Sequence, residues 1–374
     1  MLRDGIWKKT SDIEESKSTG RGSYIISLPK EWVNEIGVEK GSEVSFKLRD
    51  DSSLILTPSK MLEEKILEPK PELKDYWVYV HEKDNPISIC RKIISLYVIN
   101  ADLIHVRFKN NLHVAEYKAA INNLVKKTLL GAEIIDESSN DMTIQILVNH
   151  PEFPVEKAIR RMAIMALSAN EIAVLSIGKK DEDTFSEVFE SKNDVSRLNL
   201  YVIRQLKFGL EENWYKELGF RSPKEFLGYR IVVNDIKSIA DNAMIISRNI
   251  NNFKKLIKDQ TLFLKENVDE ETYSQILELN SLAHKLFEDS LGAMFKRDYE
   301  HADNIISQIE SMSIRESELT TIIFSKKLDP NVSSIFSLIL DNTRRIMEYA
   351  IDISEVTLNR TIEEDTGRNN LSHN

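Results

Sequence analysis

The segment GRGSYIISLPKEWVNEIGVEKGSEVSFKLRDDSSLILTPS, residues 20–59, predicts a small β-rich domain near the start of the chain. An apolar run at 24–28 lies between Gly-Ser and Pro29, which is typical of a short strand. Pro29 suits the first turn of a helix over 30–36, and Gly37 is placed for a left-handed helix end. Two further strands are predicted on either side of an Asp-Asp-Ser-Ser turn, at 44–48 and 54–56.

A β-unit of this size buries too little surface to be stable alone. We therefore expect residues 1–60 to complete their core by pairing with a second copy, as an obligate dimer. The first strand of the unit is expected around 6–9, before a polar insertion at 11–16. The side chains expected in the core or interface are apolar or aromatic: Trp32, Ile26, Leu28, Val44 and Phe46.

The stretch SYIISLPKEWVNEIGVEKGSEVSFKL, residues 23–48, resembles the AbrB/SpoVT swapped-hairpin domain. The hallmark of that family is a strand ending in Leu-Pro-Lys-x-Trp, a short helix, a Gly-hydrophobic-x-x-Gly segment and a second hairpin. The resemblance implies an interlocked dimer that binds DNA through basic residues of its first hairpin. The DNA-binding candidates in this chain are then Lys8, Lys9, Lys17, Arg21 and Lys30.

The bulk composition is that of an ordinary soluble globular protein with two or three domains. The 374 residues are 41% hydrophobic and 29% charged, with a formal net charge of −10. No apolar run approaches the ~20 residues of a membrane span, and the first residues lack a signal-peptide core, so a cytoplasmic location is expected. A single cysteine, Cys90, excludes an internal disulfide framework and a zinc site with several cysteines.

The negative net charge of the chain argues against nucleic acid as a partner, but the charged residues are distributed unevenly along the sequence. Residues 1–30 carry six basic side chains (Arg3, Lys8, Lys9, Lys17, Arg21, Lys30) against four acidic ones (Asp4, Asp12, Glu14, Glu15). This faintly basic patch permits contact with DNA. The three carboxylates of the insertion at 11–16 would repel phosphates unless the insertion folds away.

Beyond a charged linker at 61–74, the pattern changes to alternating strands and helices. The expected strands are 76–81, 103–108 and a terminal hairpin of 133–135 with 142–148, and the expected helices are 86–100 and 114–130. This β-α-β-α-β-β order predicts a small α/β domain over 75–150. It contains no catalytic cluster.

The rest of the chain reads as helical, and the protein is therefore expected to be mainly α. The cleanest period is a seam that steps by four and three residues along the third helix, from Val232 to Ile257. A polar, disordered tail is expected over 362–374. The six predicted helices are 154–177, 182–213, 223–258, 269–297, 299–326 and 330–361.

The helical half contains an internal repeat. Ile-Ala-Asp-Asn-Ala at 239–243 with Ile246 realigns on Ile-Met-Glu-Tyr-Ala at 346–350 with Ile353, which favours two copies of a three-helix unit. A doubled bundle with this motif in the last helix of a unit resembles PhoU, the regulator of phosphate uptake. Further segments are similar to archaeal PhoU-like proteins with an AbrB-type domain in front: 85–100, 151–168 and 194–205.

The PhoU resemblance implies multinuclear iron or zinc clusters held by carboxylates four residues apart on one helix face. Here the corresponding pairs are Lys237 with Asp241 and Arg344 with Glu348, so a cation stands in place of the first ligand. We interpret both as surface ion pairs and expect little retained transition metal. The remaining weak metal candidates are Asp241, Asp341, Glu348 and Asp352. Glu355 shares one face of the last helix with Asp341, Glu348 and Asp352, and a separate pair is Glu190 with Asp194, four residues apart. A solvated charged face is the favoured interpretation, and the alternative is a weakly bound hard cation such as Mg²⁺.

Two functions from different classes follow from the two resemblances. The first is a DNA-binding transcriptional regulator of phosphate uptake, whose hairpin domain binds DNA as a dimer and whose bundle relays phosphate status. The second is an adaptor that docks on a phosphate ABC transporter or its sensor kinase and uses the first domain only to dimerise. An enzyme such as a metal-dependent hydrolase has little support, because the sequence holds no His-x-x-x-His pair, serine elbow or P-loop.

Overall fold

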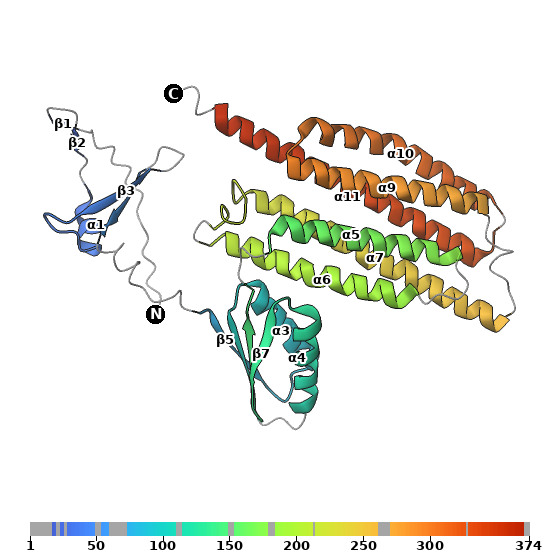
Figure 1. Cartoon of the computed structure of the whole chain (residues 1–374), viewed down its shortest axis with the longest axis horizontal. Coiled ribbons are helices and arrows are strands. Elements are labelled where there is room, and N and C mark those ends of the chain that lie inside the picture. The colour runs from blue at the N-terminus through green and yellow to red at the C-terminus, as the bar shows by residue number, and fades with distance from the viewer. Residues whose placement is uncertain are drawn as a thin grey trace. The chain divides into compact units, whose positions relative to one another are not determined.

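The computed structural model describes residues 17–19, 23–25, 28–48, 54–59, 73–109, 114–148, 153–178, 184–211, 214–260, 270–326 and 328–369. The chain forms two compact units, 1–72 and 73–374, and each is described by itself (Figure 1). No helix among the described residues is long and apolar enough to cross a membrane.

The first unit consists of two antiparallel hairpins with one helix between them in sequence. Strands β1 (Lys17–Thr19) and β2 (Ser23–Ile25) pair, helix α1 spans Lys30–Glu35, and β3 (Val44–Leu48) pairs with β4 (Leu54–Pro58). The predicted helix and second hairpin are confirmed, and Gly37 has the left-handed φ of 65° expected of a helix end.

The first hairpin contains a strand that the sequence prediction did not include. The strand that pairs with β2 is 17–19, directly before the Gly-Arg-Gly segment, whereas the predicted strand at 6–9 lies outside the described residues. Strands joined by a short glycine-rich segment pair with each other, which accounts for this register. Strand β2 begins one residue before the predicted run at 24–28, of which residues 26 and 27 lie outside the described residues.

The second unit opens with the predicted β-α-β-α-β-β layer. Its elements are β5 (Asp75–Val80), α3 (Pro86–Val98), β6 (Leu103–Phe108), α4 (Val114–Thr128), β7 (Ala132–Glu137) and β8 (Asp141–Ile146). The strand order is β5-β6-β8-β7, in which β5 and β6 are parallel and the other neighbours are antiparallel. Alternate strand residues are buried in a core shared with α3 and α4, including Val78, Ile104, Val106 and Ile144.

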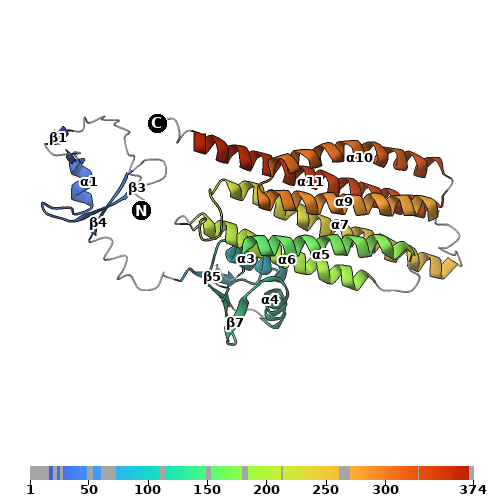
Figure 2. The ribbon, with the colours of Figure 1, turned by 45° about the horizontal axis from the view of Figure 1, so that its top comes forward.

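Six long helices follow, and they confirm the predicted pair of three-helix units (Figure 2). The N-terminal three-helix unit contains α5 (Val155–Leu175), α6 (Thr184–Gly209) and α7 (Glu225–Gln260). The C-terminal three-helix unit contains α9 (Glu270–Lys296), α10 (Tyr299–Ser325) and α11 (Pro330–Asn369). Helix α11 continues past the predicted end at 361, so a disordered tail from 362 onward is wrong for the residues up to 369.

The repeat motif occupies matching places in the two units. Ile239 and its counterpart Ile346 are both buried, as are Ala243 with Ala350 and Ile246 with Ile353. The side chains of the predicted seam on α7 from Val232 to Phe253 are buried as well. One apolar core contains residues from all six of these helices, so the two three-helix units form a single bundle.

Candidate functional site

Two large apolar side chains among the described residues of unit 1–72 are exposed in a single chain. Phe46 is 64% exposed and Leu54 44% exposed, although they belong to the paired strands β3 and β4. Among the side chains described within 17–59, only Pro58 is buried, and none of the three hydrophobic cores includes a residue from this stretch. This surface needs a partner to be shielded from water.

The structure places two of the five DNA-binding candidates. Lys17 is the first residue of β1, opposite Ile25, in the first hairpin. Lys30 begins α1 and is exposed. Lys8, Lys9 and Arg21 lie outside the described residues, so DNA contact by the five basic residues stays a prediction.

A second surface with aromatic and basic side chains is the open face of the four-stranded sheet. Trp77 is 46% exposed and stacks on His105, with ring centroids 4.6 Å apart, while the Arg107 guanidinium lies 4.7 Å from the Trp77 centroid. Both basic groups already have carboxylate partners: His105 Nε2 lies 3.0 Å from Asp75, and Arg107 Nε donates to Asp141 at 2.7 Å. This face therefore presents a self-contained network, which makes it a poor site for phosphates.

The carboxylates considered as metal ligands are paired with cations. Lys237 forms the predicted ion pair with Asp241, and Arg344 pairs with both Glu348 and Asp341, the latter at 2.6 Å. No group of three His, Cys, Asp or Glu side chains in the described part of the chain is placed to hold a metal ion. The residues at these positions thus do not fit the multinuclear cluster that the PhoU resemblance implies.

Asp352, the fourth weak candidate, instead faces another carboxylate across the bundle. Asp235 on α7 is buried, and its Oδ2 has no hydrogen-bond partner. Burial, together with the Asp352 carboxylate on α11, raises the pKa of Asp235 to about 7. Burial also raises the pKa of Asp352, with Glu355 and Glu348 adding to the effect. This pair favours a bound proton at the helix interface.

We expect Asp235→Asn to stabilise the protein at pH 8 but not at pH 4. Because the folded-state pKa lies above the ordinary value of 3.8, the stability that Asp235 contributes in its protonated form is lost as pH rises toward about 7. The amide does not ionise, so its advantage should grow over that range to about 4 kcal/mol. Urea unfolding at both pH values measures this, with exposed Asp303→Asn as control. An equal effect at pH 4 and pH 8 would contradict the prediction.

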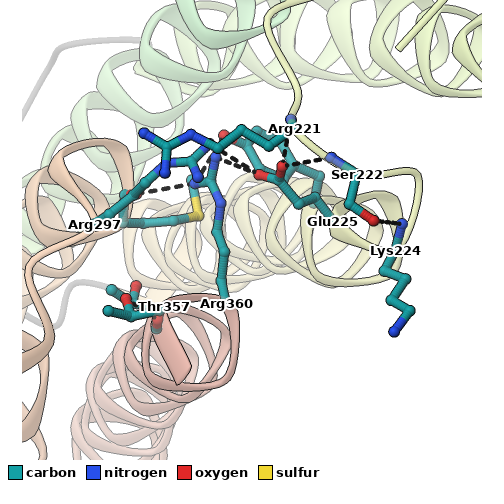
Figure 3. A network of polar contacts seen from close by, with 10 residues as sticks. Arg221, Ser222, Lys224, Glu225, Arg297, Thr357 and Arg360 are labelled. Carbon is teal, nitrogen blue, oxygen red and sulfur yellow. Dashed lines mark hydrogen bonds and ion pairs between the residues drawn. The ribbon is translucent and has the colours of Figure 1, made fainter. Parts of the chain in front are cut away.

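The most buried charged cluster gathers around Glu225 at the start of α7 (Figure 3). Glu225 Oε1 accepts hydrogen bonds from the backbone N–H groups of Arg221 at 2.7 Å and Ser222 at 3.1 Å. The Ser222 hydroxyl oxygen accepts from the Lys224 N–H at 3.2 Å, so the segment caps the first turn of the helix. The Glu225 side chain is only 4% exposed.

The second oxygen of Glu225 meets two arginines from the other three-helix unit. Arg360 of α11 forms an ion pair with it, and Arg297 Nη2 lies 3.3 Å away. Arg360 Nη1 also donates to the Met294 carbonyl at 3.1 Å, which ties α11 to the end of α9. One carboxylate therefore connects three helices through charge-assisted hydrogen bonds.

Arg297 reaches this network from an unusual backbone conformation. Its φ is 60°, in the left-handed region that favours glycine, at the junction of α9 and α10. Such a conformation costs on the order of 1 kcal/mol for a non-glycine residue, and the ion pair with Glu225 offsets that cost. Sequence reasoning missed the cluster, although Ser-x-x-Glu at 222–225 is a capping signal that marks the start of a helix.

Comparison with known proteins bears on both halves of the chain. The family described as "Antidote-toxin recognition MazE, bacterial antitoxin" matches residues 17–63, and this MazE/AbrB-like match confirms the predicted AbrB-type domain at that place. No curated protein matches the chain.

Among solved structures, the phosphate transport system regulatory protein PhoU from Streptococcus pneumoniae is similar to this chain. The similarity covers 55% of this chain and 91% of that one, with 14% sequence identity and a TM-score of 0.42. At this TM-score the likeness carries no argument about function.

Proposed function

We propose that the chain is a DNA-binding transcriptional regulator of phosphate uptake. The observation that carries the DNA-binding part is the family match over 17–63, the stretch that forms two hairpins around a short helix. The phosphate part rests on the repeat motif and on the order of the domains, an AbrB-type domain followed by PhoU-like helices. In this proposal the helical half relays phosphate status to the hairpin domain.

Dimerisation is the first step of the proposal, because a two-fold arrangement of hairpins would bring both basic patches to one DNA duplex. A second copy that covers Phe46 and Leu54 would also remove their large exposed apolar area from water. A surface that is buried against its own equivalent forms an isologous interface, as in most homodimers.

We expect the full chain to sediment as a dimer or larger oligomer at micromolar concentration, and Phe46→Asp to shift it to the monomer. The substitution puts a charge at the centre of the proposed interface, while in the single chain the side chain is 64% exposed and supports no core. Phe324→Asp on α10, where the native side chain is 72% exposed, is the matched control and should leave the oligomer intact. A monomeric wild type would refute the dimer.

DNA binding is tested with a promoter duplex of phosphate-transport genes from the same genome, and with a scrambled duplex of equal length. We expect tighter binding to the promoter. Lys8→Glu combined with Lys9→Glu should weaken binding to both duplexes by roughly tenfold or more, because phosphate contacts position the protein without reading sequence. The control variant replaces two exposed lysines on α4, Lys126 and Lys127, by Glu. It should bind the promoter duplex and the scrambled duplex with unchanged affinity.

The adaptor function is favoured by the net charge of −10 and by the acidic insertion at 11–16. On that reading the hairpin domain only dimerises, and the bundle docks on a phosphate ABC transporter or its sensor kinase. Absence of binding to both duplexes, with an intact dimer, would select the adaptor over the regulator.

A further inference from the structure

A cleft of about 490 Å³ lies where the α/β layer meets helices α5 and α6, inside the second compact unit. Leu130 and Val148 line it from the layer, and Phe153 and Met165 line it from the bundle. These four side chains are partly buried and pack against the bundle core. The cleft therefore offers an apolar wall on each side, at the kind of junction where small-molecule sites are common.

The walls of the cleft are held by hydrogen bonds from buried tyrosines. Tyr97 Oη donates to the Leu130 carbonyl at 3.0 Å, and Tyr201 Oη donates to the Phe153 carbonyl at 2.7 Å. Gly131 approaches Val148 so closely that a Cβ at that position would lie 1.6 Å from a Val148 methyl group. These contacts fix the positions of Leu130, Val148 and Phe153, which line the cleft.

Charged side chains at the cleft carry an excess of positive charge. Arg161 of α5 and Arg197 of α6 line it together with one carboxylate, Asp194. Neither guanidinium has an ion-pair or hydrogen-bond partner in the described part of the chain, and the Arg197 Nε is buried without an acceptor. Leaving a buried donor without an acceptor is unfavourable, so an anionic group that accepts from Arg197 would be bound favourably.

We propose that this cleft binds a small organic anion, with its carboxylate, sulfonate or phosphate-ester group between Arg161 and Arg197 and its apolar body against Phe153 and Met165. The volume suits a molecule of drug-like size, and the apolar walls favour a ligand with a hydrocarbon or aromatic part over a bare inorganic ion. The two guanidinium groups select negative charge, because Arg presents a planar fork of donors to such groups. The site does not depend on DNA binding by the hairpin domain.

The test uses the full chain and the aromatic sulfonate 8-anilinonaphthalene-1-sulfonate as a fluorescent probe. Arg197→Leu and Arg161→Leu should each weaken the probe's affinity at least tenfold, Arg197→Lys should weaken it less, and exposed Arg230→Leu on α7 should leave it unchanged. Octanoate should displace the probe, whereas octanol at the same concentration should not. Circular dichroism establishes that each variant is folded.

Three results would overturn the proposal: unchanged probe affinity in both arginine-to-leucine variants, displacement by octanol as effective as by octanoate, or inorganic phosphate bound as tightly as octanoate. The last result would indicate a plain phosphate site without an apolar requirement. Each can occur with DNA binding intact, so failure here is distinguishable from failure of the proposed regulatory function.

Discussion

Replacing Glu225 by Gln is expected to lower the free energy of unfolding of the helical unit by about 3–5 kcal/mol. The amide oxygen of Gln can still accept from the N–H groups of Arg221 and Ser222, so the helix cap survives. What disappears is the negative charge opposite Arg297 and Arg360, whose side chains are 15% and 8% exposed. Arg360, which is buried, and Arg297, which is mostly buried, then lose the Glu225 carboxylate, and removing one partner is the costly way to break a buried ion pair.

The matched control is Glu278→Gln. Glu278 is 62% exposed and pairs with Arg315 at 2.6 Å, so its loss should cost less than about 1 kcal/mol. Adding Arg360→Met to Glu225→Gln removes one uncompensated cation and should restore part of the lost stability. Chemical denaturation of the full chain followed by helical circular dichroism gives these differences. Equal costs for Glu225→Gln and Glu278→Gln would show that the network around Glu225 contributes little.

Arg204→Met should cost about 2–4 kcal/mol and loosen the α/β layer from the bundle. Arg204 on α6 is 2% exposed, and its Nη1 donates to the carbonyls of Tyr97 at 2.6 Å and Ala101 at 3.0 Å. These acceptors lie at and just beyond the end of α3, where a cation is favoured by the helix dipole. Methionine fills most of the space but donates nothing, so the Ala101 carbonyl loses its hydrogen bond from Arg204 and the Tyr97 carbonyl keeps only its backbone bond from Asn100.

Amide hydrogen exchange distinguishes a local effect of this substitution from a global one. Protection should fall most in α3, between 86 and 98, because this helix is joined to the bundle through Arg204. The control Arg345→Met removes an exposed guanidinium that pairs with Asp341 at 3.0 Å, and should leave α3 unchanged. Uniform loss of protection over the whole unit, or none in α3, would contradict the assigned role of Arg204.

The elements that sequence reasoning predicted best are those with a strong apolar period. The seam on α7 from Val232 to Phe253 is buried as expected, because hydrophobic spacing reports directly which helix face meets the core. The β-α-β-α-β-β order was predicted equally well, since the hydrophobic residues of strands and of helices repeat with different periods. In both cases the physical signal lies within a short window of the sequence.

The features that were missed depend on contacts between distant residues or on backbone propagation. Strand β1, Lys17–Thr19, is short and polar and so carries no alternation of its own. Helix α11 continues beyond Ile362 to Asn369, because each residue added to an existing helix forms a further backbone hydrogen bond. The cluster of Glu225, Arg297 and Arg360 joins three helices, and no local pattern shows which buried arginine meets which carboxylate.

The contacts of the candidate site likewise include some that the sequence predicts and some that it does not. The ion pairs of Lys237 with Asp241 and of Arg344 with Glu348 were predictable, because residues four apart share a helix face. The proximity of Asp235 to Asp352 was not, because it depends on how α7 packs against α11. The basic residues of the hairpin domain follow from the family resemblance and stay a prediction.

The salt dependence of DNA binding tests the central claim most directly. Each phosphate contact releases counterion, and six to eight contacts by a dimer predict that log affinity falls against log salt with a slope of about −5 to −7. The double variant Lys8→Glu/Lys9→Glu should show a flatter slope and weaker binding to every sequence. A wild type whose binding does not respond to salt, or a double variant with unchanged affinity and slope, would contradict DNA binding through the first hairpin.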